Sequence, residues 1–169
     1  MNVSASRQSA KPAKLIQIFY GDSFNYHNKI ERTSDLISIS NIDIYVQNEN
    51  ERNYDLSEEN VGEFRLKARE GERYQLRFYN RSTTTSYEIV TTVDGLDVIN
   101  GQTGSLSHPG YLLLPRTELM INGFRRDISR VAAFRFSGVA QSYAAHSLTG
   151  KMENVGVIGI AIYEVSVQI

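Results

Sequence analysis

The sequence of 169 residues has a formal net charge of −1 and contains no cysteine. This charge balance argues against a general electrostatic affinity for nucleic acid or anionic membranes, and the lack of thiols excludes disulfides and Cys-ligated zinc. A chain of this length is typical of one domain with its own core, so we expect a fold held together by packing and hydrogen bonds alone.

The first 14 residues, MNVSASRQSAKPAK, are polar and show no periodic apolar positions that would bury a face. They predict a flexible amino-terminal arm over residues 1–14, followed by a single folded domain over residues 15–169. The positive charges of the arm are not followed by the apolar h-region of a secretory signal, and no apolar run approaches the roughly 20 residues of a membrane span. We therefore expect cytoplasmic synthesis without a signal peptide and no membrane partner.

Strand-like segments follow one another from residue 15 onward. In RYQLRFYN, the apolar residues Tyr74, Leu76 and Phe78 alternate with polar ones, which is the period of a half-buried strand. In LISISNIDIYV the alternation shifts phase, and we interpret the shift as a single-residue bulge near Ser40 and Asn41. In the first half of the chain the predicted strands cover residues 15–20, 36–47, 63–68 and 73–80.

The second half of the chain continues the same pattern. The longest strand signal is VGVIGIAIYEVSVQI, where isoleucines occupy one face while Gly159 and Ala161 occupy the other and favour close approach of a neighbouring strand or chain. Only residues 137–150 have a composition that suits a short helix. The sequence therefore predicts an all-β fold, an antiparallel β-sandwich of jelly-roll type with one short helix at most. The further strands cover residues 86–93, 96–99, 110–114, 118–123 and 131–136.

The segment VDGLDVINGQTGS combines carboxylates at Asp94 and Asp97 with a side-chain amide at Asn100. Its Asp-Gly and Asn-Gly pairs are the dipeptides favoured in two-residue hairpin turns. An EF-hand loop needs oxygen ligands at alternate positions and a closing glutamate, whereas these three residues are spaced by three and position 105 is serine. We interpret the segment as two tight turns with solvated carboxylates. We predict no metal and no cofactor, and keep Asp94, Asp97 and Asn100 as weak metal candidates.

No coherent catalytic set is visible in the sequence. The histidines His27, His108 and His146 share no metal-ligand spacing, and the Gly-x-Ser-x-Gly marker of serine hydrolases is missing. Within the arginine-rich segment FRRDISRVAAFRF, the run RVAAFRF lacks the glycine and the leading aromatic residue of an RNA-binding strand. We therefore expect a protein that is not an enzyme and has no nucleic-acid partner, with a hydrolase built from residues distant in sequence as an open alternative.

Aromatic residues gather in the segment IFYGDSFNYHNK. A mixture of aromatic and polar side chains suits a sugar-stacking platform or a protein contact, and core packing is the alternative. The candidate binding residues are Phe19, Tyr20, Asp22, Phe24 and Tyr26.

Four runs in the second half of the chain, SYEIVTTVDGLDVINGQTGS, HPGYLLLP, INGFRRDISRVAAFRFSGVAQSYAA and NVGVIGIAIYE, point to a family. Together they resemble a core found in uncharacterised bacterial and phage proteins that look like β-sandwiches. The resemblance covers residues 86–164 and implies the fold but no activity and no catalytic residues.

These observations favour a non-enzymatic structural or interaction protein that forms a homo-oligomer or docks on a larger assembly. The expected form is a phage virion component, either a capsid decoration or a tail protein, located in the virion. The motivation is the abundance of strands, the small-residue strand face and the amino-terminal arm, which would order on a neighbouring protein. The alternative is a carbohydrate-binding β-sandwich module with a glycan as partner.

Overall fold

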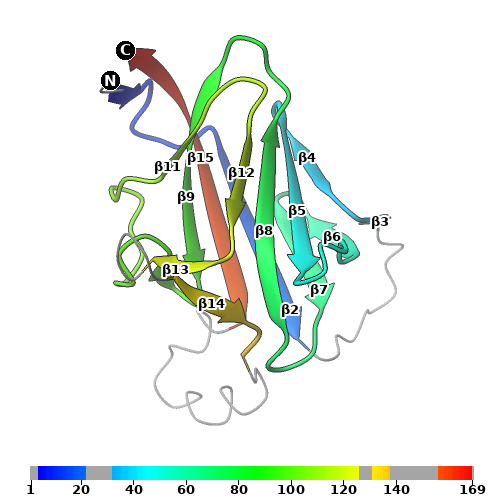
Figure 1. Ribbon diagram of the computed structural model, residues 1–169. Helices are drawn as coiled ribbons and strands as arrows, with labels where there is room; N and C mark the ends of the chain where they lie inside the picture. The colour runs from blue at the N-terminus through cyan, green and yellow to red at the C-terminus, as the bar shows by residue number, and fades with distance from the viewer. Residues whose placement is uncertain (1–3, 22–31, 126–130, 138–155, 169) are drawn as a thin grey trace.

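The computed structural model describes residues 4–21, 32–125, 131–137 and 156–168. Within these ranges the chain forms fifteen strands and no helix, which confirms the predicted all-β class. The strands make two sheets that pack face to face as a sandwich (Figure 1). Apart from Ser137, the segment whose composition suits a short helix lies outside the described residues.

The larger sheet, sheet A, has the strand order β10-β9-β15-β2-β7-β6-β3, and in addition β1 pairs with β15 and β11 pairs with β9. One pair differs from the predicted antiparallel arrangement, because β2 and β7 run parallel. The strands are β1 (Ser4–Arg7), β2 (Lys14–Gly21), β3 (Arg32–Ser34), β6 (Leu56–Asn60), β7 (Glu63–Lys67), β9 (Ser86–Val93), β10 (Leu96–Asp97), β11 (Tyr111–Leu113) and β15 (Val157–Gln168).

The smaller sheet, sheet B, has the order β13-β14-β8-β5-β4, and β12 pairs with β8. A two-residue turn at Ser40 and Asn41 joins β4 to β5 and places Ile39 opposite Ile42. The phase shift in LISISNIDIYV is therefore a hairpin, and the predicted bulge is wrong. The strands are β4 (Ile37–Ile39), β5 (Ile42–Asn48), β8 (Arg73–Asn80), β12 (Glu118–Ile121), β13 (Gly123–Arg125) and β14 (Val131–Arg135).

The core lies between the sheets and follows the alternation of the sequence. On β15 the isoleucines Ile158, Ile160 and Ile162 are buried, and on β8 every second residue from Tyr74 to Phe78 is buried in the same core. Each such side chain contributes about 1.5–3 kcal/mol by leaving water. The opposite face of β15 contributes to a second, smaller cluster on the outside of sheet A, made of Val90, Ala161, Tyr163 and Val165.

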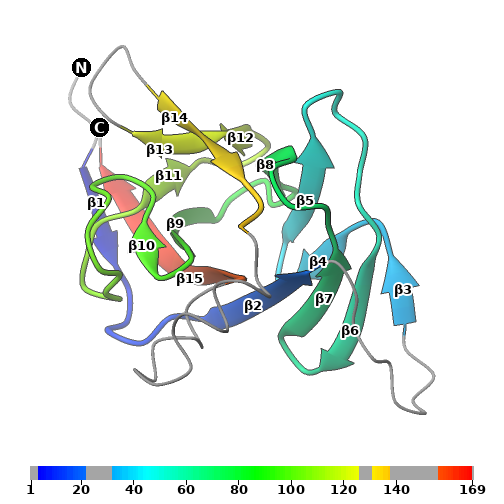
Figure 2. The same cartoon turned by 90° about the horizontal axis from the view of Figure 1, so that it is seen from below.

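The predicted flexible arm does not hold for residues 4–7, because they form β1. This strand pairs antiparallel with the end of β15, with Arg7 opposite Val165 (Figure 2). The backbone N–H groups of Gln8 and Ala13 then donate to carbonyls of β15, Glu164 and Ile162. Backbone pairing explains why a polar, non-periodic segment joins the sheet.

Aromatic rings fill one part of the core. The ring of Tyr74 stacks on Phe136, with 4.1 Å between centroids, and on Phe134, with 5.4 Å. Tyr20 lies tilted against Phe136 at 4.9 Å. The hydroxyl of Tyr74 is buried and has no hydrogen-bond partner among the described residues, and this burial raises the pKa of Tyr74 well above its usual value.

We expect Tyr74→Phe to leave the protein as stable as the wild type or to stabilise it by about 1 kcal/mol, because the substitution removes an unpaired buried hydroxyl and keeps the stacked ring. Urea denaturation checks this. A loss of stability would mean that the hydroxyl has a partner in solution. Tyr20→Phe serves as the contrast, because the hydroxyl of Tyr20 is hydrogen-bonded.

Candidate functional site

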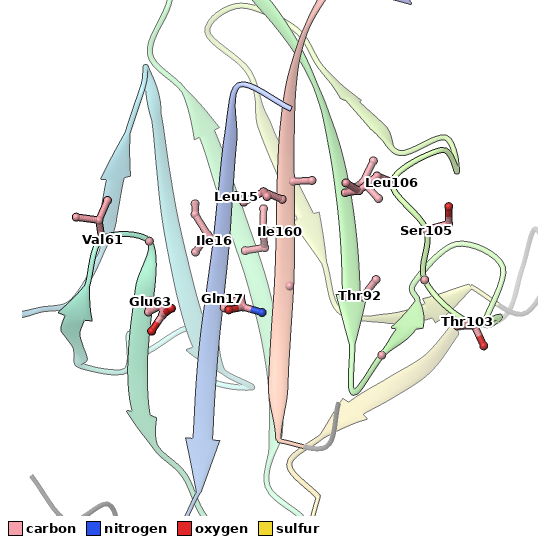
Figure 3. A pocket seen from close by; sticks show the side chains of 16 residues that line it. Leu15, Ile16, Gln17, Val61, Glu63, Thr92, Thr103, Ser105, Leu106 and Ile160 are labelled. Carbon is pink, nitrogen blue, oxygen red and sulfur yellow. The ribbon is translucent and has the colours of Figure 1, made fainter. Parts of the chain in front are cut away.

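The outer face of sheet A carries a groove of about 550 Å³. Strands β2, β15 and β9 form its floor (Figure 3). The turn between β6 and β7 forms one wall, and the segment between β10 and β11 forms the other. We call residues 103–110 of that segment the wall loop. The groove is therefore assembled from five separate parts of the chain.

The groove exists because the central strand presents its smallest side chains here. Gly159 lies between Gln17 of β2 and Thr92 of β9, and Ala161, two residues further along β15, lies on the same face of the sheet. A Cβ atom at position 159 would lie 2.7 Å from the Thr92 hydroxyl oxygen, so there is no room for a larger residue without a shift of Thr92. The predicted small-residue face of β15 is thus the floor of an open depression.

Apolar side chains stand on the rim of the groove. Leu15 is 58% exposed, Leu106 is 47% exposed, and Val61 at the tip of the β6–β7 turn is 98% exposed. Glu63 is the one ionisable side chain among the described residues that line the groove, and it accepts a hydrogen bond from the Asn60 amide. Because apolar surface in water is unfavourable by about 25 cal/mol per Å², a partner that covers this rim gains stability.

Arg7 of β1 holds the wall loop against the sheet. Its Nε lies 2.5 Å from Glu88 Oε1, and its two Nη atoms donate to the carbonyls of Leu106, at 2.6 Å, and His108, at 2.8 Å. The guanidinium carbon lies 3.8 Å from the centroid of the Tyr163 ring. Tyr163 in turn donates its hydroxyl to the Leu106 carbonyl at 3.2 Å.

Asp94 occupies the predicted turn, but its carboxylate is not the solvated group that the sequence suggested. Asp94 and Gly95 both have positive φ angles, 52° and 82°, as a two-residue hairpin between β9 and β10 requires. The carboxylate accepts hydrogen bonds from the Tyr20 hydroxyl at 2.6 Å, the Ser137 hydroxyl at 2.7 Å and the Gly156 N–H at 2.7 Å. Asp94 therefore joins β2, the second residue after β14 and the residue before β15.

This contact also affects Tyr20. Burial and the nearby Asp94 carboxylate raise the pKa of the Tyr20 hydroxyl, because both disfavour a phenolate. The hydroxyl therefore remains a hydrogen-bond donor to Asp94 over the whole neutral range.

Asp97 is also buried rather than solvated, and it caps the next turn. Its Oδ1 accepts from the N–H groups of Ile99, at 2.8 Å, and Asn100, at 3.2 Å. The loop closes when the Gly101 N–H donates to the Asp97 carbonyl, so it is longer than the predicted two-residue turn. The second carboxylate oxygen, Oδ2, lies 3.5 Å from His108 Nδ1 in the wall loop.

The weak metal candidates do not share one site. Asp94 binds donors from Tyr20, Ser137 and Gly156, whereas Asp97 faces His108, near which Asn100 also lies. Within the described ranges, no group of three or more His, Cys, Asp or Glu side chains lies close enough to hold a metal ion.

The two described aromatic binding candidates, Phe19 and Tyr20, do not line the groove. The Tyr20 ring is buried in the core, and Phe19 is half-buried with the Arg65 guanidinium carbon 5.6 Å from its ring centroid. Asp22, Phe24 and Tyr26 lie outside the described residues. The binding surface predicted for this segment thus stays a prediction, except that Tyr20 offers no exposed face.

Comparisons with protein-family models, with curated proteins and with solved structures find no significant match. The resemblance over residues 86–164 therefore stays a prediction. Among the described residues, no helix is long and apolar enough to cross a membrane.

Proposed function

We propose that the protein is a non-enzymatic assembly protein, and that the groove on sheet A receives a second copy of the same chain. The observation that carries this proposal is the open groove itself. Its floor lacks side-chain bulk at Gly159, and its rim exposes Leu15, Val61 and Leu106 to solvent. Clustered aliphatic side chains around a depression are typical of protein contact surfaces.

Charge favours a second copy as the occupant. The chain has a net charge of only −1, so two copies do not repel each other strongly. The arginines beside the groove are neutralised within the chain, Arg7 by Glu88 and Arg65 by Glu59. A two-fold axis would bring the same patch of both copies together, so that Val61, the most exposed rim residue, faces the groove of the other copy.

We further propose that this contact builds a larger assembly, and that the assembly is a phage virion in which the protein is a capsid decoration or tail component. One observation and one expectation support this. The described residues leave the outer face of sheet A uncovered at the groove, and residues 86–164 are expected to resemble a core found in bacterial and phage proteins. Carbohydrate binding finds no support in the groove, because none of the described residues that line it is aromatic; that alternative depends on residues 19–26.

The test is the solution mass of the protein, measured by light scattering coupled to size exclusion over a concentration series. We expect a mass of at least twice 19.1 kDa for the wild type. The double variant Leu15→Glu with Val61→Glu places two charges on the rim, and we expect it to weaken self-association at least about 100-fold, since each buried unpaired charge opposes docking.

The control is Leu114→Glu with Val131→Glu, which replaces the same residue types at exposed positions, 39% and 53%, that do not line the groove. We expect this control to associate like the wild type. A wild type that stays monomeric at every concentration, or a rim variant that associates normally, would contradict the proposal.

A further inference from the structure

We propose that Arg7 of β1 sets the position of the wall loop. The groove then has its observed shape only when β1 is docked on β15. The role of this shape in binding rests on the function proposed above, but the coupling between β1 and the wall loop does not.

The first step is that Arg7 tethers the middle of the wall loop. Other described hydrogen bonds of the loop are internal, such as His108 N–H to the Ser105 carbonyl, or lie toward its two ends, where Gly104 N–H donates to Gly95 and Gly110 N–H donates to Glu88; the His108 ring also lies within hydrogen-bond distance of the Asn100 amide. The Leu106 and His108 carbonyls are held to the sheet by Arg7 and, for Leu106, also by the Tyr163 hydroxyl, while the His108 ring lies 3.5 Å from Asp97 of β10. Leu106 is itself a rim residue, so the tether fixes one edge of the groove.

The second step is that Glu88 of β9 binds both Arg7 and the end of the wall loop. One carboxylate oxygen, Oε1, pairs with Arg7, and the other, Oε2, accepts the N–H of Gly110 at 3.0 Å. The planar guanidinium group has its donors at fixed angles, so it holds Glu88 and the Leu106 and His108 carbonyls in a set relative arrangement. Lysine at the same position would keep the charge but not the spacing.

The third step is that β1 depends on Arg7. The strand has four residues, of which Ser4, Ala5 and Ser6 are exposed and only Arg7 is partly buried. Little apolar surface therefore holds the strand on β15, and the contacts of Arg7 stabilise strand and loop together. A partner that binds the groove in its observed shape then favours docking of β1, and undocking of β1 weakens binding of that partner, since linkage is reciprocal.

The experiment is hydrogen exchange by NMR on the full chain, which reports the amides of Gly104, His108 and Gly110 in the wall loop. We expect Arg7→Ala to speed exchange at His108 and Gly110 at least 10-fold and Gly104 less, because Gly104 is bonded to Gly95. Arg7→Lys should lie between Arg7→Ala and the wild type, and it replaces Arg7→Ala as the decisive variant if the alanine variant does not fold.

Arg81→Ala is the matched control. Arg81 also pairs with a carboxylate, Asp43, and donates to a carbonyl, Ser40, but it does so beside sheet B. We expect this variant to leave wall-loop exchange unchanged. Wall-loop exchange in Arg7→Ala equal to that of the wild type would overturn the inference, as would equal acceleration in Arg81→Ala.

Self-association separates this inference from the proposed function. If both hold, Arg7→Ala weakens association at least 10-fold, whereas the rim variant of Leu15 and Val61 weakens association and shows the wild-type wall-loop exchange when both proteins are compared at concentrations at which they are monomeric. If the wild type is monomeric, the proposed function fails and the exchange data still decide the coupling. Faster exchange with unchanged association would overturn the part of the inference that concerns binding.

Discussion

Asp94→Ala is expected to lower the free energy of unfolding by about 3 kcal/mol, because it leaves several partly buried donors without an acceptor. The hydroxyls of Tyr20 and Ser137 and the N–H of Gly156 all donate to this carboxylate. Alanine also strains the turn, since residue 94 has a φ of 52°. Urea denaturation monitored by tyrosine fluorescence measures the loss.

Two further variants separate the carboxylate from the turn. Asp94→Asn keeps a residue that tolerates positive φ but replaces one acceptor oxygen with a donor, so we expect an intermediate loss. Tyr20→Phe removes one donor and leaves the others in place, and it should cost about 1 kcal/mol. If Asp94→Asn is as stable as the wild type, the carboxylate does not hold these segments together and only the turn matters.

Gly110→Ala is expected to cost at least about 3 kcal/mol, because a Cβ at this position has no space and large losses follow from forced backbone shifts. It would lie 2.2 Å from the carbonyl oxygen of Ile89 and 2.6 Å from its carbon, both backbone atoms of β9. Relief requires β11, which begins at Tyr111, to move away from its pairing with β9. Thermal and urea unfolding both measure the effect.

Gly159→Ala is the control for Gly110→Ala, because the atom that crowds a Cβ at position 159 belongs to a side chain and not to the backbone. Its Cβ would meet only the Thr92 hydroxyl, the end of a side chain that can rotate. We expect a loss below about 1 kcal/mol, in the range of ordinary surface substitutions. Equal losses for Gly110→Ala and Gly159→Ala would show that β11 adapts more easily than the contact distances imply.

Alternation of apolar and polar residues in the sequence predicted the strands that bury one row of side chains in the core. The isoleucines of β15 and the aromatic and apolar residues of β8 point into the core as the period of two requires. The short strand β1 escaped prediction because its side chains bury almost nothing, and its place depends on backbone pairing and on Arg7. The sequence predicted a bulge at Ser40 and Asn41, where the structure has a turn, because a bulge and a two-residue turn both shift the phase of an alternating segment.

The groove and the role of Asp94 could not be predicted from short sequence patterns. Leu15, Gly159 and Leu106 come together only through the pairing of β2, β15 and β9 and the path of the wall loop. Asp94-Gly95 carries a clear turn signal, but the partners of the carboxylate, Tyr20 and Ser137, are distant in sequence. Sequence patterns describe neighbours along the chain, whereas these sites depend on neighbours across the sheet.

The central position of β15 determines the order in which the molecule is completed during translation. β9 and β2 do not pair with each other; each pairs with β15, which follows every other described strand in the sequence. Sheet B lies wholly upstream, from Ile37 to Arg135, so it is available to form on the ribosome first. Until β15 emerges, β2 and β9 expose open strand edges, and its insertion between them is a late, non-local event of the kind that folds slowly and requires protection from aggregation.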